Sequence, residues 1–189
     1  SSSMNISHQE SSNEVKVYTA GSDFVLIDTP GLFGFKEQFN AETNAIEKYK
    51  DITRKYISEA HLLLYVMSST NPIKESHKDD LVWLFRTLNL LPRTVFVLSR
   101  FDEVADVEDE EEYNNGLAIK RDNVSARLHD LIGLSSEEVE DLSIVAVAAN
   151  PFDMGLEYWL SSPEKFKILS HIGTLQQATS VKVDANGGI

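Results

Sequence analysis

Three short polar stretches each follow an apolar run typical of a buried strand, and their residue types could build a ligand site. They are Asp28-Thr29-Pro30-Gly31, Ser99-Arg100-Phe101-Asp102 and Ala148-Ala149-Asn150. In a sheet of parallel strands covered by helices, ligands bind outside the carboxyl ends of the strands. If the three apolar runs belong to one such sheet, these stretches lie at its ligand-binding edge.

The first stretch has the chemistry of a metal and phosphate site. An aspartate at a strand end, here Asp28, can hold a water on Mg²⁺, and the amide of a glycine just beyond it, Gly31, can contact a terminal phosphate. Asp, Pro and Gly are also ordinary turn residues, so a plain strand-to-loop turn is the alternative.

Strand-like and helix-like segments alternate along the chain and would position these stretches. Segments 15–19 and 24–28 are too close for a crossover connection and predict an antiparallel hairpin. Further strands are expected at 62–67, 94–98 and 142–148, and helices at 42–60, 76–90, 113–132 (ending at Gly133), 163–179 and a short segment capped by Ser135 and Glu138. This order predicts an α/β fold, with a mostly parallel sheet, helices on both faces and an antiparallel edge hairpin.

The composition excludes several classes of function. The 189 residues carry a net charge of −13 and include no cysteine, which rules out disulfides and thiolate metal sites. So acidic a surface repels nucleic acid, and the five scattered histidines lack the spacing of zinc ligands. The acidic stretch 106–112 is expected to be a solvated loop and helix N-terminus. A polar amino terminus and the lack of a membrane-length apolar run predict a cytoplasmic protein.

In sequence order, the three stretches resemble the third, fourth and fifth signature motifs of the Ras-like, TRAFAC-class GTPases, which have a P-loop NTPase fold. Residues 28–31 match D-x-x-G in its D-x-P-G form, 99–102 stand at the place of [NT]-K-x-D, and 148–150 resemble S-A-K. The resemblance implies that GTP or GDP binds with Mg²⁺. It assigns the γ-phosphate to Asp28, Thr29, Pro30 and Gly31, with the metal on Asp28, and the guanine to Ser99, Arg100, Asp102 and Ala149.

The individual residues match the guanine motif to different degrees. By this resemblance Asp102 would accept both N–H groups of the guanine edge. Arg100 would replace the usual lysine and lie over the ring. Ser99 departs from the pattern, because it lacks the side-chain amide that braces the base loop.

Longer stretches, VLIDTPGLFGFKEQFN and VLSRFDEVADVEDEEEY, look like the G domain of bacterial dynamin-like GTPases. Leu32 stands where many Ras-like proteins carry a water-orienting glutamine, so the resemblance identifies no catalytic residue in this chain. The dynamin-like and translation-factor-related branches of the superfamily also lack this glutamine. The resemblance to them implies that hydrolysis relies on other groups, a partner subunit or a monovalent cation. The resemblance also implies a homodimer through G domains, and membrane contact only through a helical stalk outside this sequence.

The phosphate-binding loop of this superfamily is missing from the sequence. Its motif, G-x-x-x-x-G-K-[ST], needs two glycines five positions apart, and no two of the nine glycines are so spaced. We therefore expect a polar leader or first-switch remnant at 1–14, a partial G domain without its first strand at 15–180, and a flexible tail at 181–189.

Two main functions are open at this point. One is a GTP-binding and GTP-hydrolysing G domain, present here as a portion that is inactive alone. The other is a non-catalytic or truncated G domain that acts as a protein-interaction scaffold. A third hypothesis, an unrelated doubly wound enzyme, would require a buried histidine–carboxylate pair beside Asp28.

Overall fold

The computed structural model describes residues 16–20, 24–28, 51, 55 and 60–186, in two compact units, 1–60 and 61–189. In the first unit, β1 (Lys16–Ala20) pairs antiparallel with β2 (Phe24–Asp28), as predicted. These strands form a two-stranded sheet of their own, so an edge position on a larger sheet stays a prediction. Most of the predicted helix at 42–60 lies outside the described residues.

The second unit contains a parallel sheet in the order β3 (Leu63–Ser68), β4 (Thr94–Ser99) and β5 (Ser143–Ala146). The predicted α/β class and these three strands are confirmed. The central strand β4 is apolar almost throughout, and its residues from Thr94 to Leu98 are buried on both faces. The edge strand β3 is buried on one face only, because Leu64 and Val66 are 37% and 63% exposed. The sequence predicted a strand at 62–67, and half of its side chains are less buried than so continuous an apolar run indicates.

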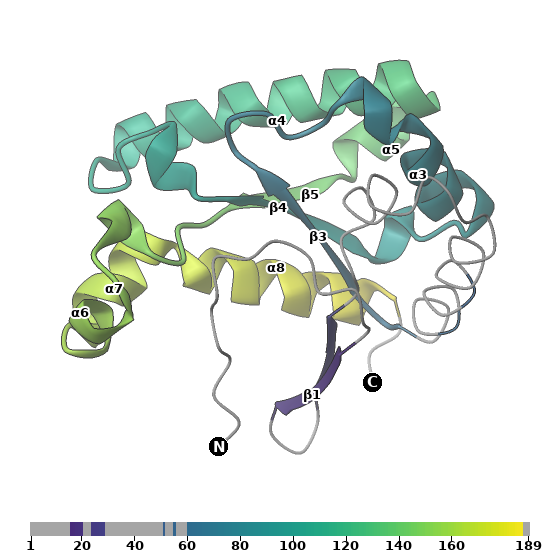
Figure 1. Cartoon of the computed structure of the whole chain (residues 1–189). Coiled ribbons are helices and arrows are strands. Elements are labelled where there is room, and N and C mark those ends of the chain that lie inside the picture. Colours follow the sequence, from purple (N-terminus) through teal and green to yellow (C-terminus); the bar gives the residue numbers. More distant parts are fainter. Residues whose placement is uncertain (1–15, 21–23, 29–50, 52–54, 56–59, 187–189) are drawn as a thin grey trace, which may run out of the picture. The chain divides into compact units, whose positions relative to one another are not determined.

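Helices cover the two faces of this sheet, and Figure 1 shows α4 (Glu110–Ile132) and α8 (Ile172–Ala185) on opposite sides of it. On one face, Phe85 packs against Tyr65 and Phe96 with ring centroids 5.8 and 5.4 Å away. On the other, Leu175 and Ala178 of α8 pack against valines of β4 and the β5 segment. The remaining elements are η1 (Glu75–His77), α3 (Lys78–Val82), η2 (Trp83–Thr87), η3 (Leu91–Arg93), η4 (Phe101–Glu103), α5 (Ser136–Glu140), η5 (Pro151–Asp153), α6 (Leu156–Leu160) and α7 (Pro163–Ser170).

Local signals identified several helix ends, although the long helix α4 begins at Glu110 rather than at the predicted residue 113. Asp109 caps α4 by accepting from the amides of Glu111 and Glu112, and Gly133 ends it with φ 67°. The acidic stretch is thus a loop and a helix N-terminus, as expected. The predicted helix at 76–90 instead combines a 3₁₀ turn, α3 and a π-helical turn.

The predicted helix at 163–179 is two helices. His171 adopts a left-handed backbone (φ 54°) that ends α7 and begins α8. Because α8 continues to Ala185, residues 181–185 are helix rather than tail. None of the helices within the described part of the chain is long and apolar enough to span a bilayer.

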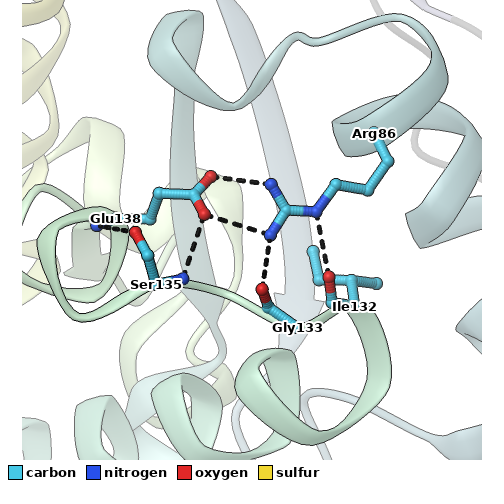
Figure 2. A network of polar contacts seen from close by, with 5 residues as sticks. All are labelled: Arg86, Ile132, Gly133, Ser135 and Glu138. Atoms are coloured by element: carbon cyan, nitrogen blue, oxygen red, sulfur yellow. Dashed lines mark hydrogen bonds and ion pairs between the residues drawn. The ribbon is translucent and has the colours of Figure 1, made fainter.

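Arg86 joins the end of η2 to the turn between α4 and α5 (Figure 2). Its Nε and Nη2 donate to the carbonyls of Ile132 and Gly133, both at 2.9 Å. Its two terminal nitrogens also donate to the Glu138 carboxylate at 2.8 and 3.1 Å. Glu138 accepts from the Ser135 amide as well, which completes the predicted capping box. One guanidinium thus satisfies the last carbonyls of α4 and fixes the start of α5.

We expect Arg86→Ala to lower the free energy of unfolding by about 1–2 kcal/mol, because it removes hydrogen bonds from a partly exposed charged group. Urea unfolding measures this, and the control is Arg121→Ala, at an exposed arginine of α4. Equal losses in the two variants would contradict the role of Arg86.

Hydrogen bonds from Arg86 and from the Ser135 amide hold the pKa of Glu138 below its ordinary value of 4.5. The contribution of Glu138 is therefore complete above pH 4.5 and is lost as the pH falls through the folded-state pKa. Urea unfolding of wild type and Glu138→Gln at several pH values measures this. A difference in stability between wild type and Glu138→Gln that grows toward low pH would contradict this pH dependence.

Gly116 in α4 lies against the loop that follows β4. A Cβ added there would lie 3.0 Å from Cβ of Ala105 and 3.4 Å from Cζ of Phe101, which is fully buried. We expect Gly116→Ala to destabilise the chain by about 1 kcal/mol, since overpacking outweighs the gain in helix propensity. The control is Gly173→Ala in α8, whose Cβ would meet nothing within 4 Å; it should be neutral or stabilising. Equal thermal unfolding midpoints for the two variants would refute the packing constraint.

Candidate functional site

The structure brings the second and third predicted stretches together at the carboxyl ends of β4 and β5. Ser99 is the last residue of β4, Asp102 lies in η4, and Ala149 follows β5 in an exposed position. The amide of Phe101 donates to the carbonyl of Val147 at 3.0 Å. The amide of Phe152 donates to Oδ2 of Asp102 at 2.9 Å. Stretches almost fifty residues apart in sequence therefore form one surface.

The first predicted stretch belongs to the other unit of the chain. Asp28 is the last residue of β2, as expected for a residue at a strand end. Thr29, Pro30 and Gly31 lie outside the described residues. The roles predicted for these four residues stay predictions.

Ser99 has a bracing role between two strands. Its Oγ donates to the carbonyl of Met67 at 2.9 Å, while its own carbonyl accepts from the amide and Oγ of Ser69 at 3.2 and 2.5 Å. These bonds join the carboxyl ends of β3 and β4. The side chain that departs from the guanine motif thus fixes the strand ends that carry the site.

Arg100 and Asp102 differ in how firmly they are held. The Arg100 backbone is left-handed (φ 54°), and its side chain, 75% exposed, pairs with Glu103 at 2.8 Å. Such an exposed ion pair is weak, so the guanidinium can move to another partner. Asp102 is half-buried, and its neighbour Phe101 is fully buried. The carboxylate therefore stands on a fixed backbone.

A column of three rings, from Phe101, Tyr113 and His171, supports the segment that follows β4. Phe101 contacts Tyr113 edge to face, with centroids 5.3 Å apart, and Tyr113 stacks on His171 at 3.6 Å with nearly parallel planes. The Tyr113 hydroxyl donates to the carbonyl of Ala146 in β5 at 2.8 Å. The ring column ties η4 to α4, β5 and the turn between α7 and α8.

Sequence reasoning missed the role of the segment 150–155. Asn150 accepts from the Gly155 amide with Oδ1 and donates to Asp153 with Nδ2, both at 2.9 Å. Within this turn Phe152 and Asp153 have φ of 57° and 55°. The Asn-Pro pair and the following Asp-Met-Gly are typical turn residues and could have indicated a turn. They carry no signal for the contact with Asp102.

The described residues do not assemble a metal centre. They contain no group of three or more His, Cys, Asp or Glu side chains that could hold a metal ion. Mg²⁺ takes one or two carboxylates together with waters and phosphate oxygens. The predicted Mg²⁺ ligand is Asp28, and its role stays a prediction.

An open cleft of about 410 Å³ lies elsewhere, between the segment after β3 and helix α4. Its lining includes Thr70, Ile73, Lys120 and Arg127 and none of the predicted site residues. The guanine contacts predicted from the sequence lie outside this cleft.

Comparisons with known proteins relate the chain to the dynamin-like class. Residues 134–189 match the family model described as "Dynamin-like helical domain". Among solved structures, the chain is similar to "LeoA bacterial dynamin GTPase from ETEC", with 40% sequence identity and a TM-score of 0.79. The similarity covers 97% of this chain but only 31% of that one, so the chain spans about a third of its relative. No curated protein matches it.

The family model and the sequence interpretation describe the same residues differently. The sequence predicted that 134–180 belong to a G domain, whereas the matching model is that of a helical domain. Within this region the structure has β5 in the parallel sheet, followed by three α-helices. Both similarities are to dynamin-like proteins, and the assignment to a G domain stays a prediction.

We expect Tyr113→Phe to lower the free energy of unfolding by about 1–2 kcal/mol, because the buried carbonyl of Ala146 loses its donor. Burial raises the pKa of Tyr113 from 10.0 to about 12. This contribution is therefore complete below pH 10 and is lost as the pH rises through about 12. Ultraviolet titration should show one late-titrating tyrosine fewer in this variant than in wild type, whereas Tyr158→Phe should keep the late step. Burial also raises the pKa of Tyr65, so that tyrosine titrates late in all three proteins. Identical titration curves for Tyr113→Phe and wild type would contradict the assignment.

Proposed function

We propose that residues 99–102 and 148–152 recognise the guanine base of GTP and GDP, in a G domain of a bacterial dynamin-like GTPase. The observation that carries this proposal is the contact between these segments at the carboxyl ends of β4 and β5, where Phe152 donates to Asp102. This is the edge at which parallel α/β sheets bind ligands. The similar structure is that of a dynamin GTPase, which supports the same nucleotide.

Each residue has a distinct role in this proposal. The Asp102 carboxylate accepts the two N–H groups of the guanine edge. The Ala149 amide, which makes no hydrogen bond with the described residues, donates to the guanine oxygen. Arg100 leaves its exposed pair with Glu103 and lies over the ring, as planar guanidinium groups do on aromatic surfaces.

The phosphate end of the nucleotide is assigned to Asp28, Thr29, Pro30 and Gly31. Bound Mg²⁺, with a water held by Asp28, would neutralise charge on the phosphates. Hydrolysis of GTP is part of this proposal because the similar structure is a dynamin GTPase. The proposal identifies no catalytic residue in this chain.

Fluorescence titration with labelled GDP, GTP and ATP, with and without Mg²⁺, tests the proposal. We expect saturable binding of both guanine nucleotides in preference to ATP. Asp102→Ala should weaken binding at least about tenfold, because two hydrogen bonds to a carboxylate are lost. Asp122→Ala, which removes an exposed carboxylate on α4, is the charge-matched control. Equal affinity for ATP and GTP, or no binding by a chain that melts cooperatively, would refute the proposal and favour a folded interaction scaffold.

A further inference from the structure

The turn at 150–155 includes a backbone conformation that Phe152 disfavours. Left-handed φ angles are uncommon for residues with a bulky side chain, and Phe152 adopts one directly before Asp153, a residue type that tolerates them better. Such backbone persists only where its surroundings fix it. The two hydrogen bonds of Asn150, to the Gly155 amide and to the Asp153 carboxylate, close the turn across its ends.

The consequence of this conformation is the direction of one amide. The Phe152 N–H is aimed at Oδ2 of Asp102 at 2.9 Å, while the Phe152 ring stays 46% exposed. The ring therefore contributes little packing that could by itself explain the strained position. Oδ1 of Asp102 receives no hydrogen bond from the described residues.

A single amide leaves most of the carboxylate available to a ligand. An ionised carboxylate has about four acceptor positions on its two oxygens, and Phe152 uses one of them. A hydrogen bond of this kind limits rotation of the carboxylate about its χ2 angle, which is otherwise broad. The orientation of both oxygens is thus set before any ligand arrives.

We propose that the Phe152 amide, held in place by Asn150, is a positioning group that determines guanine specificity through Asp102. This rests on the proposed function, since it concerns how Asp102 recognises the base. Guanine presents a ring N–H and a 2-amino group, so both carboxylate oxygens must be oriented together to accept both. Hypoxanthine has the ring N–H but lacks the 2-amino group. A carboxylate free to rotate loses the second hydrogen bond first, and with it the distinction between the two bases.

Base-monophosphate binding to the ¹⁵N-labelled full chain, followed by NMR, tests this inference. GMP, IMP and AMP are the probes, because the recognition concerns the base. In wild type we expect GMP to bind about tenfold more tightly than IMP, which is the effect of one hydrogen bond to a charged group. The Phe152 amide resonance should shift along the GMP binding curve, since ligand donors weaken its bond to the shared carboxylate.

Three variants separate positioning from general stability. Asn150→Ala releases the turn and should reduce the GMP preference to within about twofold of equality, the change that loss of one such bond predicts. Asn186→Ala removes comparable bonds from an asparagine amide to the carbonyls of Pro92 and Lys182 in another part of the unit. It should leave the preference unchanged. Phe152→Gly keeps the amide and suits a left-handed backbone, so it should also retain the preference.

The outcomes distinguish this inference from the proposed function. If GMP binds selectively but Asn150→Ala keeps the full preference over IMP, the positioning role is refuted and guanine recognition stands. A Phe152 amide that stays unmoved at GMP saturation in wild type refutes it as well, without any variant. If GMP and AMP bind alike or not at all, the proposed function fails, and the inference fails with it.

Discussion

The arrangement of the second unit depends on burying the central strand β4 on both faces. Val95, Phe96, Val97 and Leu98 are each at most 3% exposed, so this strand needs a neighbour on each edge and helices above and below. Its amides and carbonyls must all be paired inside the sheet, because an unpaired buried backbone group is costly. Parallel pairing with β3 and β5 satisfies them. The apolar run of β4 ends at Ser99, and the candidate site begins there.

The candidate site consequently has a firmly packed base and exposed side chains on its solvent side. Phe101 is anchored by the ring column of Tyr113 and His171, and Ser99 joins the ends of two strands. Arg100 and Ala149, by contrast, are exposed. Preorganised acceptors on a rigid base with exposed groups around them suit the capture of a planar ligand from solvent. The His171 break between α7 and α8 belongs to this support, since a continuous helix would not place that ring against Tyr113.

Local signals in the sequence account for the strands, for several helix ends and for the meeting of two polar stretches. Apolar runs identified β3, β4 and β5, and cap chemistry identified Gly133 and the pair of Ser135 and Glu138. What escaped prediction depends on contacts between distant residues. Arg86 lies 52 positions from Glu138, and Asp102 lies 50 positions from Phe152. A backbone amide has no side-chain identity to mark it, and the left-handed His171 and Phe152 contradict the propensities on which sequence prediction relies.

Base recognition and binding strength are separable in such a site. Each hydrogen bond to a carboxylate contributes about 1.5–3 kcal/mol, whereas association costs at least about 4 kcal/mol. Two bonds to Asp102 and one from Ala149 would therefore give a base alone a weak but measurable affinity. The same bonds discriminate strongly, because a ligand lacking one donor leaves a fixed acceptor unsatisfied. In the proposed guanine site, phosphate contacts would then supply most of the affinity, and the Asp102 carboxylate would supply the choice of base. The orientation of that single carboxylate would consequently have more influence on which nucleotide is bound than on how tightly it is bound.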